Sequence, residues 1–332
     1  MFIINSYTLA IFFCIITMLC WGSWANTMKL SSKNWPFQLY YWDYSLGLVL
    51  TAILLGLTLG SAGENGRSFI PDLMQAGSSA LGSALLGGVV FNLSNLLIVA
   101  AIDIAGMAVA FPIAVGLALV IGVVVNYLAV PVGDPWLLFI GLALVVLAII
   151  VDAIVYGKLP SANRSIGKGI IISVLSGILM GFFYRFVAAS MVENPAIPEV
   201  GKMTSYSAML IFTVGILLSN FLWNTIFMYK PVKGEPVKYT EYFTKGSTRL
   251  HLIGIAGGLI WCIGMSFNLI ASSQAGFAIS YGLGQGATMI AAAWGVFVWK
   301  EFAQAPKGTN KLILAMFTLF IAGLAMIILA KV

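Results

Sequence analysis

Several apolar stretches of the chain carry amides, hydroxyls and aromatic rings at intervals of three or four residues. The longest such series is Tyr281, Gln285 and Thr288. Side chains three or four positions apart lie on one face of a helix, so these three share a face. Polar groups inside an apolar segment are costly, and they usually face the interior of a helix bundle or a water-filled cavity. The series therefore indicates a hydrogen-bonding site for a solute.

The same reasoning applies along the rest of the chain. It selects candidate solute-binding residues that each place an amide, a hydroxyl or an aromatic ring in an apolar segment: Trp21, Trp24, Asn26, Asn92, Asn95, Asn220, Asn224, Asn268, Tyr281, Gln285 and Thr288. Such a lining suits a neutral, planar or ring-shaped solute that stacks on aromatic faces and bonds to amides. The alternative for each amide is a hydrogen bond that joins two helices.

Two charged residues inside apolar segments have competing interpretations. Asp43 is either a protonatable group that couples solute movement to protons or the partner of Lys29 or Lys33 in a salt bridge. Arg185 is a possible solute-binding or gating residue, and it could equally pair with Glu193 or extend toward water.

Three other titratable residues are interpreted as incidental or interfacial. His251, the single histidine, begins an apolar segment, and we expect no special role for it. Asp103 and Asp152 lie near segment ends and are expected at the membrane interface.

The elements that position these residues follow from composition. The chain has 332 residues, of which 61% are hydrophobic and 8% charged, whereas soluble domains carry about 25% charged residues. A membrane-spanning helix needs about 20 apolar residues. We therefore predict an all-α polytopic membrane protein with ten transmembrane helices, at residues 7–28, 38–60, 76–101, 105–128, 136–156, 169–190, 206–229, 252–272, 275–299 and 312–331.

The basic residues predict the orientation. Of the 17 lysines and arginines, thirteen fall on one side of the predicted membrane and three on the other. Basic loops face the cytoplasm, so both termini are expected outside, in a multi-pass plasma membrane protein embedded in the lipid bilayer. The same residues are spread over short loops, which argues against nucleic-acid binding.

An internal repeat appears at an offset of 170 residues. The stretch 87–116 resembles 257–286, with identical pairs that include Gly88/Gly258, Ala105/Ala275 and Gly106/Gly276. Five spans per copy is an odd number, so the copies would cross the membrane in opposite senses. We expect two inverted five-helix repeats, 1–157 and 168–332, joined by a linker at 158–167. This is an architecture of alternating-access transporters.

Motifs for other chemistry are absent from the sequence. No HExxH, GxSxG or phosphate-binding loop is found, so we expect no enzyme activity, cofactor or metal. Cys14, Cys20 and Cys262 have no paired spacing and are interpreted as small buried side chains.

The chain resembles the drug/metabolite transporter superfamily, and within it the branch of ureide permeases and glucose/ribose/rhamnose porters. The resemblance rests on "YYWDYSLG" (40–47), "GGVVFNLSN" (87–95), "AGMAV" (105–109), "GGLIWCIG" (257–264), "QAGFA" (274–278), Gln285 and "WGVFVWKEF" (294–302). It implies a secondary transporter with ten spans in two inverted repeats, often proton-coupled, and it points to Asp43, Asn95 and Gln285. The short central connection looks bacterial, which implies the inner membrane.

The sequence thus predicts a monomeric importer of a small neutral solute together with a proton, or with sodium. A ureide or nucleobase-like ring is favoured over a monosaccharide because the lining is rich in amides. The alternatives are uptake of a sugar, broad export of metabolites or drugs, and a membrane receptor that binds a ligand without transporting it.

Overall fold

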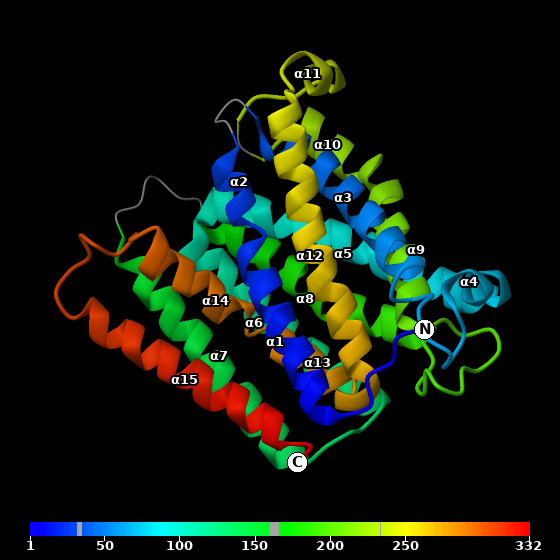
Figure 1. The fold of residues 1–332 in the computed structure, drawn as a ribbon. Coiled ribbons are helices and arrows are strands. Elements are labelled where there is room, and N and C mark those ends of the chain that lie inside the picture. The colour runs from blue at the N-terminus through cyan, green and yellow to red at the C-terminus, as the bar shows by residue number, and fades with distance from the viewer. Residues whose placement is uncertain (32–34, 160–165, 233) are drawn as a thin grey trace.

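The computed structural model describes residues 1–31, 35–159, 166–232 and 234–332, and in these ranges nearly all regular structure is helical (Figure 1). The helices before the central connection are α1 (Tyr7–Ser23), α2 (Asn26–Leu30), α3 (Phe37–Leu57), α4 (Phe69–Gln75), α5 (Ser78–Ala105), α6 (Met107–Ala129) and α7 (Pro135–Gly157). Those after it are α8 (Ile166–Ser190), α9 (Ser205–Asn220), α10 (Trp223–Tyr229), α11 (Tyr239–Thr244), α12 (Thr248–Ala275), α13 (Phe277–Gly284), α14 (Ala287–Ala293), a π-helical turn η1 (Trp294–Val298) and α15 (Thr309–Leu329).

Nine helical stretches among the described residues are long and apolar enough to cross a membrane, which confirms a multi-pass helical membrane protein. The tenth expected span, 275–299, is a broken helical run made of α13, α14 and η1. Around Gly286 the backbone hydrogen bonds reach only three residues back, from Gly286 N to Leu283 O and from Thr288 N to Gln285 O. Glycine weakens a helix because it has no side chain to restrict its backbone, and Gly282, Gly284 and Gly286 lie at or near the break.

The two longest helices, α5 and α12, match in length and in how they end. Each has 28 residues, and each stops at a glycine with positive φ, 81° at Gly106 and 83° at Gly276. Only glycine adopts this backbone conformation without strain. The two helices begin and end 170 residues apart.

The predicted halves do not pack as separate bodies. The most extensive helix contacts join 1–157 to 168–332, and they pair α5 with α8 and α9, α3 with α12, and α7 with α15. In Figure 1, α7 and α15 run side by side, α2 and α11 lie at the top of the view, and the chain ends lie lower. Most of the predicted linker, residues 160–165, lies outside the described residues.

Glycines allow the closest of these helix contacts. A methyl group on Gly88 of α5 would lie 2.1 Å from the Phe212 carbonyl oxygen of α9. A methyl group on Gly258 of α12 would lie 2.1 Å from the Tyr44 carbonyl oxygen of α3. Close backbone approach at small residues is how membrane helices gain packing energy, so these two positions hold the bundle together at matching sites.

Candidate functional site: an aromatic cavity within the bundle

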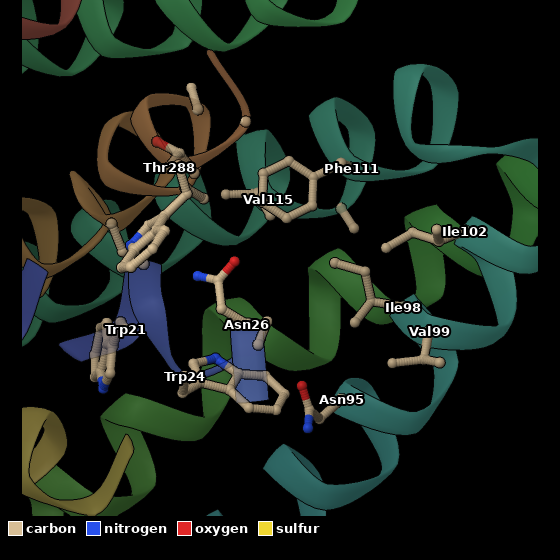
Figure 2. A pocket seen from close by; sticks show the side chains of 18 of the residues that line it. Trp21, Trp24, Asn26, Asn95, Ile98, Val99, Ile102, Phe111, Val115 and Thr288 are labelled. Carbon is tan, nitrogen blue, oxygen red and sulfur yellow. The ribbon is translucent and has the colours of Figure 1, made fainter. Parts of the chain in front are cut away.

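A cavity of about 510 Å³ lies within the bundle. Its walls carry nine aromatic rings among aliphatic and small side chains, and the rings come from α1 and its C-terminal end, α5, α6, α7, α8, α12 and the region of η1: Trp21, Trp24, Phe91, Phe111, Tyr156, Phe183, Trp261, Trp294 and Trp299. Figure 2 shows Trp21, Trp24 and Phe111 facing this space, together with aliphatic side chains of α5 such as Ile98. This size and this lining are typical of sites that bind small organic molecules.

The cavity has an open rim and a buried floor. Exposed Lys29, Asp103 and Trp299 line it at the end of the bundle where α2 and α5 terminate. The floor contains Phe183 and Trp261, which are 1% and 5% exposed. Among the described residues, the exposed part of the cavity lining thus lies at this end of the bundle.

A buried hydrogen-bonded layer lies behind the floor. The Tyr281 hydroxyl is 3.3 Å from Ala118 O and 3.2 Å from Met180 O, and both of these residues line the cavity. Next to it, the Tyr184 hydroxyl donates to Asn268 Oδ1 at 2.7 Å, and Asn268 Nδ2 donates to Ser280 O at 2.7 Å. This layer joins α6, α8, α12 and α13 and closes the inner end of the cavity.

Six of the eleven predicted solute-binding residues line the cavity: Trp21, Trp24, Asn26, Asn95, Gln285 and Thr288. Asn26 is held in place, because its Oδ1 accepts from Trp299 Nε1 at 2.6 Å and its Nδ2 donates to Ser23 O at 3.0 Å. Asn95 Nδ2 donates to the Tyr41 hydroxyl at 3.1 Å, which leaves Asn95 Oδ1 for another donor. Among the described residues, the Gln285 side-chain amide has no hydrogen-bond partner, so it can bind a solute with both groups.

The other five lie away from the cavity, and their side chains join helices instead. Asn92 Nδ2 contacts Ile216 O, Ser219 Oγ and Asn220 Oδ1 of α9 at 2.8–3.2 Å. Asn220 donates to Ser45 of α3, and Asn224 Nδ2 donates to Gln38 O at 2.9 Å. Asn268 and Tyr281 belong to the layer behind the floor. In this structure the four amides thus make the helix-joining contacts given as the alternative, and the Tyr281 hydroxyl likewise contacts other helices.

Asp43 is buried, 1% exposed, and does not line the cavity. Its carboxylate accepts from the Tyr242 hydroxyl of α11, and both of its oxygens lie 3.0 Å from His251 Nδ1. His251 therefore has a specific partner, contrary to our expectation. The lysines considered as partners are not seen there, since Lys29 pairs with Glu301 at 2.7 Å and Lys33 lies outside the described residues. Burial and the Asp43 carboxylate raise the pKa of Tyr242.

Sequence reasoning missed a polar group at the rim of the cavity. Glu301 bridges Lys29 and the Tyr156 hydroxyl, at 2.7 and 3.3 Å. Asp152, expected at the interface, is only 5% exposed and lines the cavity. The sequence signal that could have identified Asp152 as a cavity residue is that it is the single acidic residue inside the apolar 136–156 segment.

Arg185 is half-buried in α8, and it neither lines the cavity nor forms an ion pair with Glu193. Within the described part of the chain, no group of three or more His, Cys, Asp or Glu side chains could hold a metal ion.

A family model described as "Ureide permease" matches residues 40–165 and 158–330 of the chain. These matches cover most of its length. The chain belongs to the ureide permease family. Family membership makes the protein a transporter rather than an enzyme, and it confirms the ureide permease resemblance seen in the sequence.

Curated ureide permeases are similar to the chain over nearly its whole length. Ureide permease 1 of Arabidopsis thaliana is 23% identical over an alignment of 385 residues that covers 98% of this chain and 98% of the relative. Ureide permease 4 of the same plant is 22% identical with the same coverage. A solved protein crystal structure aligns with a TM-score of 0.60 at 16% identity, covering 98% of this chain and 99% of that one, and it supports the fold alone.

Proposed function

We propose that this ureide permease family protein is a secondary transporter that imports a small neutral polar solute, such as a ureide or nucleobase-like ring, together with protons. The supporting observation is the cavity, where aromatic rings lie around Asn95 Oδ1 and a Gln285 amide that has no partner among the described residues. Flat rings stack on aromatic faces, and amide edges pair with the carbonyl and N–H groups of ureides. The names of the plant relatives favour the same solute class.

Alternating access is part of this proposal. The equal lengths of α5 and α12, their matching glycine ends and the matching contacts of Gly88 and Gly258 support two inverted repeats, 1–157 and 168–332. Inverted repeats place a solute site where the two copies meet. The cavity has exposed lining residues at one end, and the layer that contains Tyr281 lies behind its inner end. This arrangement fits one of the two states that such a transporter visits.

The membrane orientation is also proposed. The cavity rim lies at the end of the bundle that carries α2 and α11 (Figure 1), next to basic residues such as Lys29 and Lys245, so the described state would face the cytoplasm with both termini outside. A membrane-impermeant thiol reagent should then label a cysteine placed at Glu235 only in inside-out vesicles of a plasma membrane. Labelling in right-side-out vesicles alone would reverse the orientation.

The proposal is tested by a thermal-shift screen of the purified protein against ureides, nucleobases, nucleosides and sugars, followed by uptake into proteoliposomes. Ureides or nucleobases should raise the unfolding temperature and be taken up faster with an inward proton gradient. Stabilisation by sugars alone, or outward transport, would favour the alternatives. Binding without uptake would indicate a receptor.

Gln285→Ala should weaken solute binding roughly five- to hundredfold, because an unpaired polar group on a buried solute costs about 1–3 kcal/mol. Binding is measured by titration of the purified variant. The control is Gln274→Ala, which truncates the same residue type outside the cavity. If Gln285→Ala lowers only thermal stability and leaves binding intact, Gln285 serves helix packing.

Asp43→Asn should remove the dependence of uptake on the proton gradient. The buried Asp43 contacts His251, whose side chain is 28% exposed, so a proton can pass between this pair and water. The variant is assayed in proteoliposomes with and without the gradient, and solute binding to the purified variant serves as the folding control. Unchanged gradient dependence would exclude Asp43 as the coupling group.

A further inference from the structure

A second acidic residue, Asp152 of α7, lies in the wall of the cavity itself. Only 5% of its surface is exposed, and its Oδ1 has no hydrogen-bond partner among the described residues. Within the same residues it forms no ion pair. Buried polar side chains nearly always have a partner, so this carboxyl group indicates a missing one.

The surrounding charges do not provide that partner. On its own helix, Tyr156 follows one turn later, and its hydroxyl contacts Glu301, whose charge is matched by Lys29. The helices packed against α7 are α6 and α15. Helix α6 carries no charged residue, and α15 carries only Lys311, which is exposed in its first turn. The remaining acid nearby in the cavity lining is Asp103 at the rim.

A buried carboxylate without a partner is expensive, and binding a proton or a cation removes that cost. A metal cation of the calcium or magnesium type needs several oxygen ligands, and the described residues hold no acidic cluster. The other charged residues of the lining, Lys29, Asp103 and Glu301, lie toward the rim, so the single buried carboxyl group of Asp152 is better suited to a proton.

We propose that Asp152 is a proton-binding site of the transport cavity, and that its protonation is linked to solute binding. This inference rests on the proposed transport function. The protonated group can donate its O–H to a carbonyl oxygen of the solute, whereas the ionised group can only accept. The coupling is reciprocal: a proton strengthens solute binding, and bound solute strengthens proton binding by the same factor.

The test is the pH dependence of solute affinity, measured by titration of the purified full-length protein. If only the protonated form binds, the apparent Kd of the wild type rises up to about tenfold per pH unit on the alkaline side of the transition. Asp152→Asn should abolish this slope, and Asp152→Glu should keep one. Asp134→Asn is the matched control, because Asp134 caps the other end of the same helix outside the cavity. A wild-type slope in Asp152→Asn overturns the proposal.

Two further measurements separate the possible failures. Infrared difference spectra between acidic and alkaline buffer should contain a carboxylic acid C=O band that Asp152→Asn removes. This readout needs no solute, so it tests the proton site even if no solute binds and the transport proposal fails. If the band is unchanged in the variant, or if replacing sodium by choline abolishes the slope, Asp152 is not the proton site.

Discussion

Val115→Trp is expected to lower solute uptake by roughly tenfold or more, since a loss of about 1.4 kcal/mol in binding is already tenfold. Val115 projects from α6 into the cavity beside Phe111 (Figure 2). An indole at this position would occupy space that a ring-shaped solute needs and would stack on the same aromatic walls. Uptake into proteoliposomes and the Kd of the purified variant are the measurements.

Val120→Trp is the control, because Val120 lies on the same helix, is 36% exposed and does not line the cavity. It should transport as the wild type does. Equal transport by both variants would show that the solute takes another route, and equal loss would show that α6 tolerates no indole.

Gly88→Ala is expected to destabilise the protein by about 1–3 kcal/mol or more, the usual cost of overpacking. The added methyl group would lie 2.1 Å from a carbonyl oxygen of α9, and a backbone atom cannot rotate away as a side chain can. Helix α5 would have to move away from α9 along their contact. Gly258→Ala should behave in the same way, since α12 meets a carbonyl oxygen of α3 at the same distance.

Thermal unfolding in detergent measures both effects. Gly82→Ala is the control in the same helix, where an added methyl group meets no atom within 4 Å. It should be neutral or stabilising, because alanine favours a helix by up to about 1 kcal/mol over glycine. If Gly88→Ala unfolds at the same temperature as Gly82→Ala, the close contact is not important for stability.

The long helices could be predicted from the sequence because hydropathy and length alone define a membrane span. The 252–272 prediction falls within α12, and the 312–331 prediction overlaps nearly all of α15. The break near Gly286 could not be predicted in the same way. A run of glycines between apolar residues is compatible with a straight, closely packed helix and with an interrupted one.

The site was only partly predictable, because spacing assigns residues to a face but not to a neighbour. Asn92 and Asn95 are three positions apart, yet Asn95 lines the cavity while Asn92 bonds to α9. Tyr281 and Gln285 are one helical turn apart, since Gln285 N donates to Tyr281 O at 3.1 Å, yet Gln285 lines the cavity and Tyr281 lies behind its floor. The contact of Asp43 with His251 joins residues 208 positions apart, and no local pattern could indicate it.

Under the alternating-access function proposed above, the interruption at Gly284–Gly286 would lower the activation barrier of the transport cycle. An unbroken helix from 277 to 298 would move as a rod, so a displacement at the rim would pull on Tyr281 and break the layer behind the floor. A break lets a few backbone dihedrals absorb the motion, so α14 and η1 can swing while α13 stays anchored. The rim and the inner layer can then open in separate steps, each with a smaller barrier than one concerted movement.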